Sequence, residues 1–207
     1  MKKIVTIVLF SMFASLMQAQ ITIGGSVYGG GNAGETKGST NVTVYAGELN
    51  NVFGGARMAN VTGSAFVNID GEHASDNIFI NSVYGGNDIA GTVGSEINQE
   101  DKNTNLVPGE LKETAENKIN NSWQAFISTS PTPETATAAE RKSLGIGSLF
   151  GGGNGDYDYS ENSPYKGLLK PELGKTYLEI QGGCIAHLYG GGNNATVKTN
   201  TTICTTS

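Results

Sequence analysis

One short phrase, an apolar residue followed by an aromatic residue and two glycines, recurs five times along this chain of 207 residues. Its copies are Val27-Tyr28-Gly29-Gly30, Val52-Phe53-Gly54-Gly55, Val83-Tyr84-Gly85-Gly86, Leu149-Phe150-Gly151-Gly152 and Leu188-Tyr189-Gly190-Gly191. Such self-similarity is typical of repeat architectures, in which a single unit has too little apolar surface and buries it only against its neighbours. We expect each glycine pair to supply positive φ at a tight corner.

The sequence around each phrase keeps the same register. Four residues before the aromatic residue, four of the five copies have a large apolar residue, namely Leu49, Ile80, Ile146 and Ile185. Fourteen residues after the first two aromatic residues, Val42 and Val67 open alternating runs that predict half-buried strands. The same type of strand returns at Leu178-Glu179-Ile180.

The five aromatic residues are separated by 25, 31, 66 and 39 residues, so the longer spacings contain insertions. Short strands that return to one register predict an all-β fold, a parallel β-solenoid of about four to five coils with a continuous core of Val, Ile and Leu. Equivalent side chains then lie ~4.8 Å apart. We expect a structural ladder of the aromatic residues, with a sugar-stacking platform as the alternative: Tyr28, Phe53, Tyr84, Phe150 and Tyr189.

The first 19 residues have the pattern of a signal peptide, with Lys2 and Lys3 before an apolar run that is too short to span a bilayer. We expect cleavage after Ala19 and export of the remaining chain to the outer cell surface or the medium, without a membrane span. The formal net charge of −6 becomes −8 after cleavage, and there is no basic cluster. Nucleic acid and anionic lipid are therefore poor partners.

Residues 95–147 interrupt the repeat between two solenoid segments, 20–94 and 148–207. In this polar stretch, apolar residues at helical spacing follow Pro108 and predict a partly helical insertion: Leu111, Ala115, Ile119, Trp123 and Phe126. The insertion is either a tolerated surface loop or a recognition appendage in which Trp123 is a ligand-binding candidate.

The second solenoid segment is expected to be incomplete, because a strand begins at Ile203, close to the last residue. An open coil leaves an unpaired sheet edge, through which we expect self-association. The chain is therefore expected to be either the N-terminal part of a longer protein or a chain that caps itself on a partner.

Few residues in the sequence are candidates for a chemical site. Asn154, Asp156 and Asp158 alternate as the ligands of calcium loops do, and the alternative is a solvated polar turn. Only two histidines and two cysteines, Cys184 and Cys204, are present, which excludes a disulfide framework and a metal site of clustered Cys and His. One disulfide between the two cysteines stays open. We expect no catalytic residues and, apart from calcium, no cofactor.

The phrase Val-Tyr-Gly-Gly-Gly-Asn at residues 27–32, with alternating strands behind a signal peptide, resembles adhesin-like surface repeat proteins of Gram-negative anaerobic bacteria. It is distantly similar to autotransporter passengers and polymorphic outer-membrane proteins. The resemblance covers about residues 20–94 and 145–203. It implies a right-handed parallel β-helix, cell-surface display, and attachment to glycans or host proteins.

The sequence thus predicts a structural and binding module rather than an enzyme. Two alternatives remain open at this point: a polysaccharide-acting β-helix enzyme, either a lyase or a hydrolase, and a truncated remnant without a function of its own.

Overall fold

The computed structural model describes residues 21–70, 77–94, 144–180 and 184–205. The expected signal peptide and most of the expected insertion, including Trp123 and its helical pattern, lie outside these ranges. Within them the chain is all-β. The strands are β1 (Thr22–Tyr28), β2 (Thr40–Val44), β3 (Gly47–Phe53), β4 (Ala65–Ile69), β5 (Ile78–Tyr84), β6 (Leu144–Phe150), β7 (Glu172–Leu173), β8 (Thr176–Ile180), β9 (Cys184–Tyr189), β10 (Thr196–Val197) and β11 (Thr201–Thr205).

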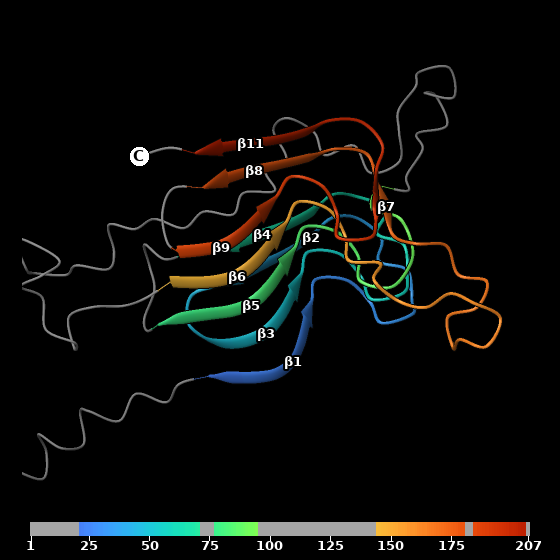
Figure 1. The fold of residues 1–207 in the computed structure, drawn as a ribbon, viewed down its shortest axis with the longest axis horizontal. Coiled ribbons are helices and arrows are strands. Elements are labelled where there is room, and N and C mark those ends of the chain that lie inside the picture. Colours follow the sequence, from blue (N-terminus) through green and yellow to red (C-terminus); the bar gives the residue numbers. More distant parts are fainter. Residues whose placement is uncertain (1–20, 71–76, 95–143, 181–183, 206–207) are drawn as a thin grey trace, which may run out of the picture.

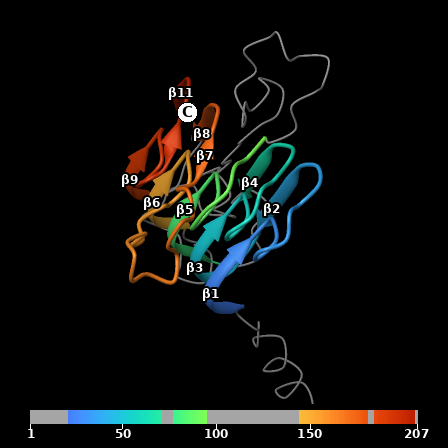
Figure 2. The same cartoon turned by 90° about the vertical axis from the view of Figure 1, so that its right-hand side faces the viewer.

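The strands that carry the repeated phrase form one parallel five-stranded sheet in the order β1-β3-β5-β6-β9. Figures 1 and 2 show these strands following one another in chain order, each beside the strand of the preceding copy. Three two-stranded parallel sheets, β2-β4, β8-β11 and β7-β10, complete the described part of the fold. We number the repeats 1 to 5 by their aromatic residues, Tyr28, Phe53, Tyr84, Phe150 and Tyr189.

The register is the one that the sequence predicts. Leu49 lies beside Ile80, and Ile80 beside Ile146. The strands expected at Val42 and Val67 are β2 and β4, and these two valines are paired. One difference concerns the insertion, which we expected to extend to residue 147. In the structure β6 begins at Leu144, so residues 144–147 belong to the sheet.

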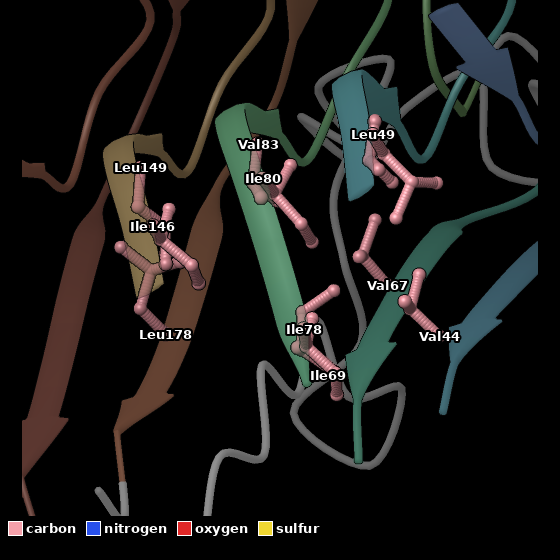
Figure 3. Packing of buried hydrophobic residues seen from close by; sticks show 11 residues of the cluster. Val44, Leu49, Val67, Ile69, Ile78, Ile80, Val83, Ile146, Leu149 and Leu178 are labelled. Carbon is pink, nitrogen blue, oxygen red and sulfur yellow. The ribbon is translucent and has the colours of Figure 1, made fainter. Parts of the chain in front are cut away.

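The main core lies between the five-stranded sheet and the sheets opposite it. Figure 3 shows Leu49, Ile80 and Ile146 of the five-stranded sheet pointing toward side chains of β4 and β8, among them Val67 and Leu178. β3 and β5 alternate buried and exposed residues over their first halves, so one set of their side chains enters this core and the other faces outward. A second, smaller core of alanine, valine and leucine lies under the turns.

The glycine pairs have a different role from the one expected. Positive φ occurs at other glycines, such as Gly38 and Gly94, and not at the pairs that follow the aromatic residues. A Cβ atom on Gly29 would lie 2.3 Å from the carbonyl oxygen of Gly54, and one on Gly54 would lie 2.6 Å from that of Gly85. At these positions glycine is required because successive backbones approach so closely that a side chain would clash, whereas a Cβ atom on Gly191, in the last phrase, would meet nothing within 4 Å.

Candidate functional site

The five repeated aromatic residues form a continuous stack, which we call the aromatic ladder. Neighbouring ring centroids lie 4.7–5.0 Å apart, and neighbouring planes are inclined by at most 9°. Both faces of Phe53, Tyr84 and Phe150 are covered by other rings, and these three residues are buried. A sugar stacks on an open ring face, so the interior rings have the geometry of the expected structural ladder and not of the alternative sugar platform. Tyr28 and Tyr189, at the two ends, each have one ladder neighbour.

A buried carboxylate lies beside this ladder. Asp88 is 2% exposed, and its oxygens accept hydrogen bonds from the Tyr28 hydroxyl at 2.7 Å, the Tyr157 hydroxyl at 2.8 Å and the Asn154 amide at 3.0 Å. The donors come from repeat 1 and repeat 4, and the acceptor from repeat 3. We call these four residues the Asp88 cluster. Because a buried carboxylate is costly unless it is hydrogen-bonded, the cluster holds these segments together.

The cluster favours protonated tyrosine hydroxyls. Burial, followed by the hydrogen bond to Asp88, raises the pKa of Tyr28 to about 12. The same two causes raise the pKa of Tyr157 as well. Both hydroxyls therefore remain donors at neutral pH, and neither is suited to act as a general base. The arrangement acts as a structural anchor between the repeats.

The residue before Asp88 adds a second buried polar group. Asn87 is 1% exposed; its Oδ1 accepts the N–H of Ala56 at 2.7 Å, and its Nδ2 donates to the carbonyls of Ala59 and Ala90 at 2.9 and 3.1 Å. One amide thus satisfies three backbone groups in the turns of repeats 2 and 3. This fixes the turn from which Asp88 projects.

Residues 154–170 leave the repeat and return to it, and we call this segment the excursion. In addition to the Tyr157 bond, the Tyr159 hydroxyl donates to the carbonyl of Ile89 at 2.5 Å. The Tyr165 ring packs edge-on against that of Tyr157, with centroids 5.3 Å apart. The tip exposes Leu168 and, at 84%, Leu169, beside a shallow groove of about 400 Å³. The excursion is therefore a fixed structure with an apolar tip.

The hydrogen bonds of the calcium candidates go to different partners and do not converge on one point. Asn154 donates to Asp88, and its Oδ1 accepts from Asn193. Both carboxylate oxygens of Asp158 accept from Ser160, which lowers the pKa of that carboxyl, while Asp156 is exposed. In the part of the chain that the structure describes, no three His, Cys, Asp or Glu residues lie together as a metal site. These bonds are compatible with the polar turn named as the alternative, and the calcium site stays a prediction.

The outer face of the five-stranded sheet contains a second groove, of about 530 Å³, which we call the sheet groove. It crosses the first halves of the strands, and its walls include Phe79, which is 41% exposed, with Asn50 and Asn81. The Phe79 ring lies over Gly145 of the next strand, because a Cβ atom there would be 3.1 Å from the ring. An open aromatic surface thus lies beside two amides on a sheet with regular pairing.

Sequence reasoning missed the Asp88 cluster and Phe79. Asp88 is not among the candidates named from the sequence, but its position, four residues after the aromatic residue, is polar in every repeat: Asn32, Arg57, Asp88, Asn154 and Asn193. These residues form hydrogen bonds across repeats, including Arg57 to Asn32 at 3.0 Å. A polar residue repeated in register was the available signal for such a row. Cys184 and Cys204 are both free thiols.

Comparisons with protein-family models, with curated proteins and with solved structures found no match to this chain. Among the described residues, no helix is long and apolar enough to span a membrane. A proposal of function therefore depends on the sequence and on the geometry of the described residues.

Proposed function

We propose that this protein is an exported structural and binding module of the cell surface, adhesin-like, built as a right-handed parallel β-solenoid and used for attachment to glycans. The observation that carries the proposal is the sheet groove, in which an exposed aromatic ring, Phe79, lies beside two amides, Asn50 and Asn81, on a stack of repeats in register.

The solenoid part of the proposal is supported by the pairing. Each strand that carries the repeated phrase pairs in parallel with the corresponding strand of the next repeat. The strands that follow the phrase also pair in parallel, β2 with β4 and β8 with β11. Returning to a parallel neighbour after each turn is the geometry of stacked coils. Right-handed connections are strongly favoured between parallel strands of one sheet, which supports the proposed hand.

The binding part follows from the chemistry of the sheet groove. Sugar rings present apolar C–H faces and hydroxyl groups, so they are bound by aromatic rings flanked by amides. Phe79 offers the first kind of contact, and Asn50 and Asn81 the second. The groove is open along the sheet, which suits a chain better than a small enclosed ligand. The expected mode is binding without turnover.

The test uses the chain collected after export, with an N-terminus at Gln20 as the sign of signal cleavage. Binding to arrayed glycans is compared for the wild type, Phe79→Ala and the matched control Tyr45→Ala, which removes an exposed aromatic residue outside the groove. We expect Phe79→Ala to weaken binding about tenfold, the equivalent of ~1.4 kcal/mol, and Tyr45→Ala to have no effect. Equal binding by both variants would contradict the groove assignment, and shortened glycan products would contradict binding without turnover.

A further inference from the structure

Repeats 1 and 5 are the first and last of the described repeats, and we call their outer sides the repeat 1 face and the repeat 5 face. The two faces have matching backbone and side-chain features. From Tyr28 to Thr40 the chain takes twelve residues to pass from the ladder to β2, and from Tyr189 to Thr201 it takes twelve to reach β11. The segment that joins the ladder to the second strand in repeat 2, from Phe53 to Ala65, has the same length. It leads to β4, which pairs with β2 of repeat 1. The connecting segments of repeats 1 and 5 are therefore equal in length, as are those of the neighbouring repeats 1 and 2.

The hydrogen-bond rows of the glycine pairs have a direction. The N–H of Gly29 donates to the carbonyl of Phe53 at 3.0 Å, and this step is repeated up to Gly151, which donates to Tyr189 at 2.9 Å. The second glycines form a parallel row, from Gly30 to Gly191. Along the described repeats, the face of repeat 1 thus presents carbonyls, at Tyr28 and Gly30. By the same register, the face of repeat 5 presents the N–H groups of Gly190 and Gly191.

The apolar core also continues to both faces. Ile203 of β11 is 42% exposed, although Leu178, its partner on β8, is fully buried. On the other face, Val42 is half-buried, whereas its partner Val67 is 1% exposed. Ile203 and Val42 lie in repeats 5 and 1, whereas Leu178 and Val67 lie in repeats 4 and 2. The first and last of the described repeats thus expose more of this core position than their neighbours do.

Among the described residues, a row of threonine hydroxyls also has a donor without an acceptor at the repeat 5 face. The Thr40 hydroxyl donates to the carbonyl of Gly54 in the next repeat at 2.5 Å, and the Thr176 hydroxyl donates to that of Gly190 at 2.6 Å. Thr201 occupies the same position in repeat 5 and is exposed. The carbonyl of Gly29 in another copy is the acceptor that this row would require.

We propose that the repeat 5 face of one molecule binds the repeat 1 face of a second copy, so that the chain assembles head to tail. β9 then pairs with β1, and β11 with β2, with Tyr189 stacked on Tyr28. The inference rests on the stacked-coil fold of the proposed function. The two faces are different, so the contact is heterologous and leads to open filaments rather than closed dimers. Lys198 approaches Lys37 of the second copy, but it is already ion-paired with Glu172 in its own chain.

The test measures the assembly of the exported chain by sedimentation velocity and electron microscopy. Wild-type chains should form filaments whose length grows with concentration. Ile203→Lys places a charge on the open core and should leave single molecules. The matched control Thr202→Lys alters the neighbouring outward residue of β11, which pairs with Tyr177, and should assemble like the wild type. A small proportion of Ile203→Lys chains should also shorten wild-type filaments, because their repeat 1 face still binds and then blocks growth.

A second pair of variants tests the hydrogen-bond row. Gly191→Pro removes an N–H that faces the second copy, at a position where a Cβ atom meets nothing within 4 Å, and Gly191→Ala keeps the N–H. Only the proline variant should lose assembly, with an unchanged circular dichroism spectrum. Wild-type chains that remain single at all concentrations, or Ile203→Lys chains that assemble normally, would overturn the inference. Glycan binding by such single chains would leave the proposed function intact.

Discussion

The interior and the end of the aromatic ladder carry equivalent residues in unequal surroundings. Phe53, in repeat 2, is stacked on both faces and is 1% exposed, while Tyr189, in repeat 5, is stacked on one ladder neighbour and is 47% exposed. The same contrast separates Leu178 from Ile203 in the core. In each pair the position in the repeat is the same, both residues are large and apolar or aromatic, and the number of neighbouring repeats differs.

This difference shows that the stability of the fold resides between repeats. A repeat contributes its own conformational cost, and the contact with the next repeat supplies most of the buried apolar area that offsets it. A side chain therefore contributes most to the free energy of unfolding where it packs against a repeat on each side. The end repeats should be the easiest to disturb and the least costly to alter.

The largest effect is expected when an aromatic ring is removed from the interior of the ladder rather than from its end. Phe53→Ala should lower the free energy of unfolding by about 3–5 kcal/mol, because it opens a cavity in a buried stack. Tyr189→Ala should cost about 1 kcal/mol, because its ring is half exposed. Urea denaturation of both variants measures the two losses. Equal losses would show that the ladder is not stabilised by nearest neighbours.

A matched variant separates stacking from volume. Phe53→Leu keeps the position apolar and loses the ring contacts with Tyr28 and Tyr84, so we expect an intermediate cost of about 1–1.5 kcal/mol. A loss as large as that of the alanine variant would indicate that ring stacking, and not filling of the space, stabilises the interior of the ladder.

The parts of the fold that depend on register could be predicted from the sequence. The spacing of the phrase predicted the parallel neighbours, the ladder and the strands at Val42 and Val67, because residues at one position of every repeat must lie together once a single pair does. The role of the glycine pairs was predicted wrongly. The sequence shows that glycine is needed there, but positive φ and close backbone approach require the same residue.

The candidate site could not be predicted in the same way. Asp88 meets donors 60 and 69 residues away, one of them Tyr157 in an excursion that occurs in a single repeat. Phe79 also breaks the pattern, because the equivalent residues on the neighbouring strands are Glu48 and Gly145. Repetition predicts what the repeats share, whereas these sites depend on what one repeat has alone.

An effect smaller than that of Phe53→Ala is expected for the buried amide of the interior. Asn87→Ala leaves the N–H of Ala56 and two carbonyls without their partner, which should lower the free energy of unfolding by about 2–3 kcal/mol. Asn193→Ala, the control, removes an exposed hydrogen bond of repeat 5 and should change stability by less than about 0.5 kcal/mol. Urea denaturation again measures both. A harmless Asn87→Ala would mean that the turns hold their shape without this amide.

The smallest expected effect concerns the tyrosines of the Asp88 cluster at high pH. The pKa of Tyr28 is raised to about 12 by burial and by its bond to Asp88, so the folded state favours the protonated hydroxyl. The stability that this contributes is complete below about pH 10, the pKa of an unfolded tyrosine, and is lost as the pH rises through about 12. Asp88→Asn keeps an oxygen acceptor but removes the charge. It should lower the pKa of Tyr28, measured by tyrosinate absorbance, but not to 10, since the burial remains. Tyr28→Phe identifies the signal, and identical titration curves for the wild type and Asp88→Asn would show that burial alone sets this pKa.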